Sequence, residues 1–278
     1  MRLVAFTLPT DPSPRTGVLA HDGARVVDLT EIGVASFAEG AARAGRLAQL
    51  AGHLLHVPGA VAHPPSGVRL LAPVGRLVAV YDSATARPAT PLADAPTSGI
   101  GAAPDGPESA VPLAPGAALG VGIVGVLARA AEQLAPADVE AQLAGVALLV
   151  CWRAPSGRLA GAVVGPWLAT LDEFDHPAAG PLALALDAAL AVNGGLARGG
   201  SWAALTGKLA GAVAAASTQA RLGPGDAVGV ATFEAAGDGA DVPPGSSPGD
   251  EVVLEATGLG ALRAFVAPGL GAAAGTER

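Results

Sequence analysis

Short apolar, β-branched runs separated by turn signals fill the C-terminal two thirds of this chain. The runs at residues 119–127 and 146–152 are apolar throughout, which is typical of strands that are buried on both faces. Pro-Gly-Asp turns at 224–226 and 248–250 each precede a further run. The pattern predicts an α+β fold dominated by strands.

Other segments of the same region carry weaker signals. Alternating leucines at 182, 184 and 186 predict a strand that leads to a hairpin turn at Asn193-Gly194. Residues 136–145 have helical spacing, with a proline in the first turn. Residues 201–217 suit a longer helix, with Ser201 as its N-cap.

The N-terminal part has a different composition. Short β-like pieces alternate there with an Ala-rich amphipathic segment at residues 36–55, which predicts one or two helices. A linker signal follows at residues 63–67. We therefore expect a small α/β domain at residues 1–65 and a larger domain at 66–278. Residues 82–116, rich in Pro, Gly and Ser, predict a long loop of the kind that often acts as a lid.

Composition excludes several classes of partner. The formal net charge of −8 and the lack of a basic run argue against nucleic-acid binding. The single cysteine, Cys151, rules out an internal disulfide and suits a reducing compartment. The uncharged stretch at 109–128 is interrupted by Pro and Gly, so we expect no membrane span. Because the first fifteen residues lack a signal-peptide core, we expect a cytoplasmic protein.

Several segments together resemble the fumarylacetoacetate hydrolase family. The core of that family is similar to residues 163–174, 221–232 and 247–266, and its small N-terminal domain is similar to residues 1–6 and 17–29. The resemblance implies a mixed β-sandwich roll with a small N-terminal α/β domain. It also implies a homodimer.

The resemblance implies a metal site whose ligands this chain lacks. Family members hold a divalent cation with a Glu-x-Glu on one strand and an Asp on another. Those positions fall on Gly120, Gly122 and Cys151 here. A hard cation requires oxygen ligands. We therefore expect no metal and no other cofactor.

The family's lid motif is changed as well. The hydrolases carry Asn-Tyr-x-x-His-x-x-Glu, whose His and Glu activate water. Tyr81 matches the tyrosine, but Ala84 and Arg87 stand at the His and Glu. In the family's Thr-Gly-Thr-Pro substrate-binding turn only Thr232 matches. The turn at Gly165-Pro166-Trp167 is intact, which favours a preserved scaffold over a preserved reaction.

Two other groups of residues could hold a metal. His53 and His56 are spaced for one helix face, although such a pair is more often solvated. Asp172, Glu173 and Asp175 offer a carboxylate cluster, which would restore an ordinary magnesium hydrolase. Their segment, however, resembles one outside the family's metal site.

The candidate site residues share a predicted place near the old metal site. Arg153 or Arg87 could pair with a substrate carboxylate or enolate in place of the metal. Lys208, the only lysine, could act as base or electrophile if it faces the cleft. The predicted catalytic residues are Tyr81, Arg153, Lys208 and Cys151, and the predicted substrate-binding residues are Arg87, Trp152, Thr232 and Glu234.

Structural alternatives remain open for several of them. Lys208 could be a solvated surface lysine. Cys151 could pack as a small apolar side chain, because it has no recognisable His partner. Asp82 and Glu234 could be solvated loop charges.

Two functions follow from this set of replacements. The first is a metal-independent enzyme that acts on a β-dicarbonyl, enolisable or polyketide-like compound by proton transfer, cyclisation, isomerisation or decarboxylation, in bacterial secondary metabolism. The second is a non-catalytic subunit or small-molecule-binding protein. The sequence alone leaves it uncertain whether the chain is an enzyme.

Overall fold

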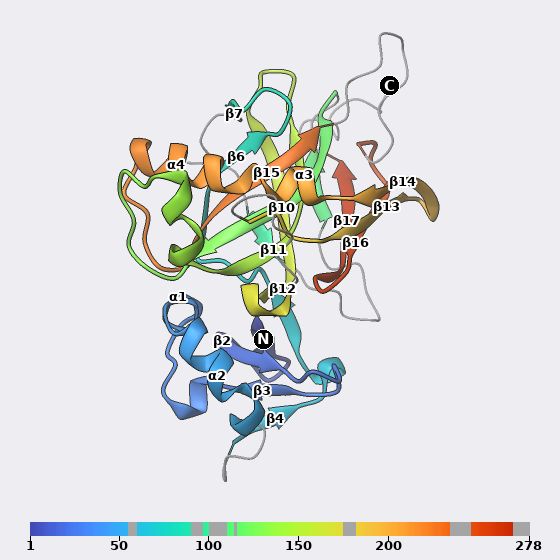
Figure 1. Cartoon of the computed structure of the whole chain (residues 1–278). Coiled ribbons are helices and arrows are strands. Elements are labelled where there is room, and N and C mark those ends of the chain that lie inside the picture. The colour runs from blue at the N-terminus through green and yellow to red at the C-terminus, as the bar shows by residue number, and fades with distance from the viewer. Residues whose placement is uncertain are drawn as a thin grey trace.

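The computed structural model describes residues 1–54, 60–89, 97–99, 110–113, 116–174, 182–233 and 246–268. Two β-sheets and four α-helices make up the described part (Figure 1). The strands are β1 (Arg2–Leu8), β2 (Asp11–Leu19), β3 (Val26–Asp28), β4 (Ala62–His63), β5 (Arg69–Leu71), β6 (Arg76–Asp82), β7 (Pro88–Ala89), β8 (Thr97–Gly99), β9 (Ala110–Leu113), β10 (Ala118–Leu127), β11 (Leu143–Arg153), β12 (Leu159–Ala169), β13 (Asp187–Val192), β14 (Gly195–Ser201), β15 (Asp226–Phe233), β16 (Glu251–Ala256) and β17 (Gly260–Pro268). The helices are α1 (Phe37–Ala42), α2 (Ala44–Leu54), α3 (Ala203–Thr206) and α4 (Leu209–Gln219), with 3₁₀ turns at Thr30–Ile32, Pro65–Gly67, Pro136–Asp138, Glu140–Gln142 and Leu171–Glu173.

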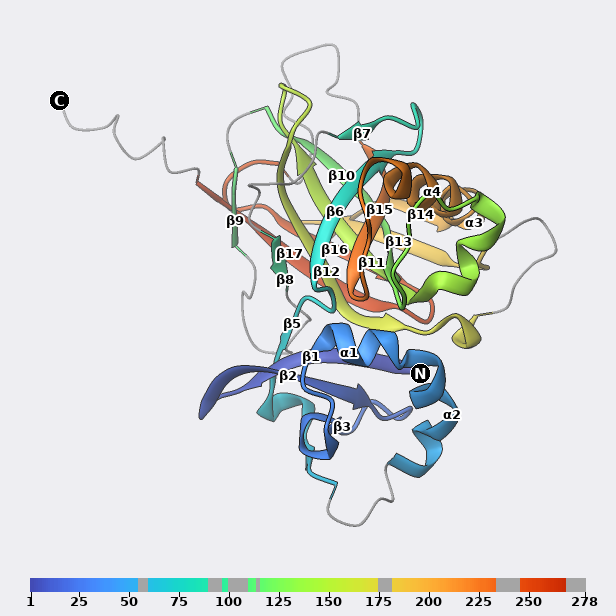
Figure 2. The same ribbon diagram turned by 90° about the vertical axis from the view of Figure 1, so that its left-hand side faces the viewer.

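The large sheet has twelve strands and runs through most of the molecule. Its order is β4-β3-β2-β1-β12-β11-β10-β15-β6-β7, with β5 on β1 and β8 on β12. The second sheet has the order β14-β13-β16-β17-β9. Figure 2 shows the N-terminal strands and helices gathered at one end, away from α3, α4 and the second sheet. The prediction of a strand-dominated α+β fold is confirmed.

The N-terminal part joins the large sheet through one strand. β1 pairs with β12 at Arg2↔Ala169 and Leu3↔Leu168. The predicted helical segment forms two helices, and the Ser36 side chain accepts a hydrogen bond from the Glu39 N–H at the start of α1. The domain boundary at residue 65 stays a prediction.

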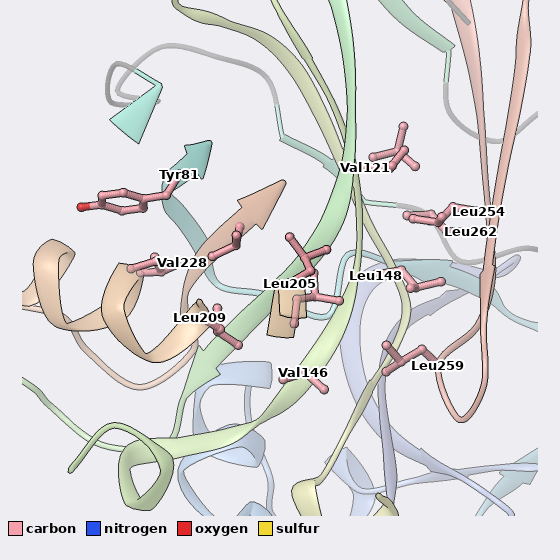
Figure 3. Close-up of a cluster of buried hydrophobic side chains, with 14 of the residues drawn as sticks. Tyr81, Val121, Val146, Leu148, Leu205, Leu209, Val228, Leu254, Leu259 and Leu262 are labelled. Carbon is pink, nitrogen blue, oxygen red and sulfur yellow. The ribbon is translucent and has the colours of Figure 1, made fainter. Parts of the chain in front are cut away.

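Three central strands explain why the sequence shows long apolar runs. β10 and β11 are buried over almost their whole length, and β12 lies beside them. One face of this part packs against α3, α4 and the second sheet, and Figure 3 shows part of this buried cluster, from Tyr81 near the helices to Leu254 and Leu262 on the second sheet. The other face packs mainly against the N-terminal part. Because both faces of these strands are covered, their sequences need not alternate between apolar and polar residues.

Four local predictions need correction. Residues 136–145 form two 3₁₀ turns before β11 begins, and not an α-helix. The loop predicted at 82–116 contains the short strands β7, β8 and β9. The linker at 63–67 contributes the last residue of β4 and a 3₁₀ turn. The leucines at 182, 184 and 186 precede β13, because i to i+2 backbone hydrogen bonds fold the chain tightly there.

The helix predicted at 201–217 is divided. It forms α3 and α4, with Gly207 and Lys208 between them, and α3 has no side-chain cap. The hairpin turn at Asn193-Gly194 is confirmed, since both residues have a positive φ and join β13 to β14. Among the described residues, no helix combines the length and the apolar character that a membrane crossing needs.

Candidate functional site

The ends of four neighbouring strands bring the predicted site positions together. β10 lies between β11 and β15, so Gly120 faces Cys151 on one side and Phe233 on the other. β6 runs parallel to β15 and places Asp82 beside Ala231. Positions far apart in the sequence therefore meet at one end of the large sheet.

The alternation of side chains divides these positions between two faces of the sheet. Gly120, Cys151 and Phe233 belong to the face that packs mainly against the N-terminal part. Tyr81 and Trp152 belong to the opposite face, under α3, α4 and the second sheet. Since successive residues of a strand point to opposite faces, the predicted residues do not form one cluster.

The two glycines at the positions predicted for the family's glutamates have no room for side chains. A Cβ at Gly122 would lie 1.9 Å from the carbonyl oxygen of Val230, which is backbone of the paired strand β15. A Cβ at Gly120 would lie 2.6 Å from the Phe233 ring and 3.0 Å from Cys151 Sγ. The first clash is with backbone, so the local strand spacing excludes any side chain at position 122.

Cys151 is the third residue at the predicted metal-ligand positions, after Gly120 and Gly122. Its side chain is fully buried, and the absence of solvation raises the pKa of its thiol well above the usual range. A protonated thiol and two glycines offer no oxygen ligands, so these residues do not fit a hard divalent cation. Burial also leaves Cys151 out of contact with a ligand and favours its role as a small apolar side chain, against the predicted nucleophile.

The other residues considered as metal ligands form no metal site among the described residues. Glu173 accepts a hydrogen bond from the Met1 ammonium at 2.6 Å, and Asp172 is exposed. His53 is exposed on α2. Within the ranges described above, no three His, Cys, Asp or Glu side chains are grouped so as to hold a metal. Asp175 and His56 lie outside the described residues.

Arg153 lies against Phe233, whose ring a Cβ at Gly120 would meet. Its guanidinium lies 4.0 Å from the centroid of the Phe233 ring, a cation–π contact. Its Nη1 donates a hydrogen bond to Asp82 Oδ2 at 2.7 Å. The Arg153 side chain is 30% exposed and that of Asp82 only 9%. A cation is therefore held at this end of the sheet with part of its surface open to solvent.

Asp82 is ionised in this arrangement. Burial works toward a higher pKa, but hydrogen bonds from the Ala84 N–H and from Arg153 outweigh it and hold the pKa of Asp82 below its usual value. The Ala84 N–H lies 2.8 Å from Asp82 Oδ1. Asp82 is thus a buried, paired carboxylate, and not the solvated loop charge considered as an alternative.

Tyr81 and Trp152 are parts of the core on the opposite face. Tyr81 is 4% exposed and Trp152 is fully buried. Figure 3 shows the Tyr81 ring pointing toward the helices. Its hydroxyl finds no hydrogen-bond partner in the described part of the chain, and desolvation raises its pKa. Neither residue lines the described cavities, so the structure gives no support to their predicted contact with substrate.

Lys208 and Thr232 meet in a cavity of about 280 Å³ on this second face. Lys208 Nζ donates a hydrogen bond to the backbone oxygen of Ser83 at 2.6 Å. The hydroxyls of Ser83 and Thr232 lie 2.9 Å apart. The complete described lining is Ser83, Arg198, Gly199, Gly200, Ser201, Trp202, Ala204, Leu205, Lys208 and Thr232.

Two predicted substrate-binding residues belong neither to the contacts around Arg153 nor to the cavity that Lys208 lines. Arg87 is exposed beyond the turn after β6, where its backbone oxygen accepts a hydrogen bond from the Asp82 N–H. Glu234 lies outside the described residues. Sequence reasoning missed Phe233 and Ser83, and also Trp202. Phe233 follows Thr232 directly, where the resemblance implies proline, so this departure was the available signal.

The comparisons with known proteins agree with this architecture. Residues 112–267 match the family described as fumarylacetoacetate (FAA) hydrolase C-terminal. No curated protein matches. Maleylpyruvate hydrolase from Sphingobium sp. SYK-6, solved in complex with manganese(II) ion and pyruvate, shares 23% identity at a TM-score of 0.67, over 97% of this chain and 100% of that one.

Two further solved structures are similar. Fumarylacetoacetate hydrolase from psychrophilic Exiguobacterium antarcticum has 20% identity and a TM-score of 0.68, covering 96% of this chain and 99% of that one. The 2-hydroxyhepta-2,4-diene-1,7-dioate isomerase from Mycobacterium marinum has 19% identity and a TM-score of 0.62, covering 96% and 98%. At these identities the neighbours establish the shared fold. Since the family match spans more than half of the chain, this protein belongs to the fumarylacetoacetate hydrolase family.

Proposed function

We propose that this protein is a metal-independent member of its family that acts on a β-dicarbonyl or otherwise enolisable small molecule. One observation carries the proposal: a Cβ at Gly122 would lie 1.9 Å from the Val230 carbonyl oxygen. A glutamate at this position requires β10 and β15 to separate. In this proposal the close packing of β10 against β15 leaves no space for a metal ligand at position 122. Replacing the glycine alone would therefore not restore the ligand.

In this proposal Arg153 supplies the positive charge at the site. A guanidinium presents several N–H donors in a plane, which suits a carboxylate or an enolate. Two neighbours fix the position of its guanidinium: Asp82 Oδ2 lies 2.7 Å from Nη1, and the centroid of the Phe233 ring lies 4.0 Å from Cζ. A cation that is oriented before the substrate arrives stabilises a developing negative charge without reorganisation. Arg153 is therefore the proposed catalytic residue, and Asp82 a positioning residue.

The reaction classes that need such a cation share one intermediate. Loss of a proton from the carbon between two carbonyl groups, or loss of CO₂ from a β-keto acid, leaves an enolate oxygen that carries negative charge. Stabilising this oxygen accelerates tautomerisation, cyclisation and decarboxylation alike. The maleylpyruvate hydrolase neighbour was solved with pyruvate, itself an enolisable 2-oxo acid, which supports this class of ligand.

A second function is favoured by a specific observation. The described contacts of Arg153 are with Asp82 and Phe233, and Asp82 has a lowered pKa that makes it a weak base. A site with a fixed cation and no strong base suits binding as well as catalysis. The alternative is therefore a non-catalytic, small-molecule-binding member of the family. The homodimer and the role in bacterial secondary metabolism also remain proposals.

Hydrogen–deuterium exchange tests the catalytic proposal directly. Acetopyruvate and acetylacetone are incubated with the purified protein in deuterated buffer with EDTA, and exchange is followed by NMR. We expect exchange above the buffer rate, unchanged by added Mn²⁺. Arg153→Met should lower the rate by about tenfold or more, and Arg153→Lys should restore part of it.

Two outcomes decide against the proposal. A rate that appears only with Mn²⁺, together with stoichiometric metal in the protein as isolated, would show that the cation site is intact. Binding of these compounds without any turnover, in wild type and Arg153→Met alike, would favour the binding protein.

A further inference from the structure

The second sheet ends in an edge strand, β14, that pairs with β13 on one side only. All seven of its residues are exposed, and the β13–β14 hairpin projects from the side of the molecule (Figure 1). Proteins usually protect such an edge with lysine, proline or inward-pointing charges. β14 contains no lysine, proline or carboxylate. Its outer backbone N–H and C=O groups have no described strand to pair with, so an added strand could use them.

A large apolar side chain projects from this edge. Leu196 is 75% exposed, far more than any other large apolar side chain that the structure describes. The pairing register shifts here and leaves Ala197 as an extra residue in β14. Leu196 therefore lies opposite Ala191. Gly199 lies opposite Ala189, and since alternate residues of β13 share a face, Leu196 and Gly199 both belong to the outer face of the sheet.

Small side chains form a groove beside Leu196. The groove has a volume of about 620 Å³ and is lined by β13, β14, β16 and the start of β17. Strand register places Gly199, Ala189, Glu255 and Ala261 in one row across it. Glycine and alanine leave the backbone surface open, which allows the backbone of another segment to approach closely.

The groove carries negative charge. Asp187 and Glu255 belong to its lining, and the described lining residues include no Lys or Arg. Both carboxylates are exposed, and neither forms an ion pair with a described residue. Arg263, in the next row of the outer face, is already paired with Glu251 at 3.1 Å. A partner that complements this groove therefore carries positive charge.

A second copy of this chain is a poorer match. Pairing of β14 with the same strand of another copy about a two-fold axis would bring two identical surfaces together. Each surface carries the uncompensated carboxylates of Asp187 and Glu255. Like charges that face each other across an interface oppose association.

We propose that β14 and its groove bind an extended peptide segment of a partner protein, with an apolar residue and a Lys or Arg four positions apart. The backbone of the segment adds a strand to β14, its apolar side chain packs against Leu196, and its cation pairs with Asp187 and Glu255. The spacing comes from β13, on which Ala191 and Asp187 share a face at a distance of about 13 Å. The proposal does not depend on the reaction at Arg153.

Fluorescence anisotropy with labelled hexapeptides tests the ligand class. The probe has the sequence LTVTKT, in which the leucine and the lysine are four positions apart. One matched peptide, LTVTET, reverses the charge, and another carries N-methyl groups on alternate amides of LTVTKT. We expect saturable binding of LTVTKT, about tenfold weaker binding of LTVTET, and a similar loss on N-methylation, because methylated amides cannot donate to a strand. Equal binding of the three peptides, or no saturable binding of LTVTKT, would overturn the proposal.

Substitutions in the groove locate the peptide. Leu196→Ser removes the apolar contact and Glu255→Gln removes one charge, and both variants should fold normally because the side chains are exposed. We expect each to weaken LTVTKT binding by about threefold to tenfold. Glu140→Gln is the matched control, because Glu140 is an exposed carboxylate outside the groove. An equal loss in Glu140→Gln and Glu255→Gln would show unspecific attraction to an acidic protein and would contradict the site.

Sedimentation velocity distinguishes a peptide partner from a second copy. We expect wild type and Leu196→Ser to have the same oligomeric state, since the proposed occupant is another protein. A wild-type oligomer that Leu196→Ser converts to a smaller species would assign β14 to self-association and overturn the proposal.

Discussion

The Val230 carbonyl oxygen lies 1.9 Å from the place where a Cβ at Gly122 would be. The two residues belong to neighbouring antiparallel strands, β15 and β10, in the middle of the large sheet. The backbone here closes over the position at which the resemblance predicts one of the family's glutamates. If the predicted placement of the metal ligands holds, their replacement and the spacing of β10 and β15 are coupled.

Gly122→Ala should destabilise the protein strongly. The added methyl group meets backbone, which cannot rotate away, so we expect a loss of about 3 kcal/mol in the free energy of unfolding. Urea denaturation followed by circular dichroism measures it. Gly211→Ala is the control, because a Cβ there has no neighbour within 4 Å on α4, and alanine should stabilise that helix by up to about 1 kcal/mol. Equal stability of the two variants would contradict the close approach at Gly122.

Asp82→Asn should change how stability depends on pH. The folded-state pKa of Asp82 is lowered, so its contribution is present above the unfolded-state pKa and is lost as the pH falls through the folded-state value. We expect Asp82→Asn to cost about 1 kcal/mol at pH 7, since Arg153 loses an ionised partner, and much less at pH 3. Chemical denaturation at both values measures the difference. An equal cost at pH 7 and pH 3 would exclude the ion pair as the cause.

The Cys151 thiol should be protected in the native protein. It is fully buried and its pKa is raised, so we expect negligible reaction with a disulfide reagent over minutes at pH 7 and little acceleration at pH 9. One equivalent should react promptly in 6 M urea, which serves as the positive control for a single cysteine. Fast stoichiometric reaction of the folded protein would instead support the nucleophilic role.

Tyr81→Phe should preserve or increase stability. The hydroxyl is buried without a hydrogen-bond partner among the described residues, so its removal relieves a desolvation cost of about 1 kcal/mol. Tyr81→Ala, which removes the ring as well, should cost about 4 kcal/mol. Thermal and urea unfolding compare the two variants. A marked loss of stability in Tyr81→Phe would reveal a partner for the hydroxyl.

Local signals in the sequence were enough for much of the fold. Apolar runs predicted β10 and β11, because strands covered on both faces need no polar side chains. Asn193-Gly194 predicted its hairpin, since few other residues adopt a positive φ at both positions. The leucines at 182, 184 and 186 misled, because a chain of tight turns before a strand can also bury leucines at every second position.

The sequence predicted Gly120, Gly122 and Cys151 at the family's metal positions, and their side chains can be recognised as poor ligands without a structure. Which side chains share a face was decided by tertiary structure alone. Strand register placed Arg153 beside Phe233 and Asp82, and the packing of α3 and α4 on the sheet placed Lys208 in one cavity with Thr232. Register is a long-range property: pairings between residues about 70 to 150 positions apart in the chain depend on how strands stack, and no local pattern records them.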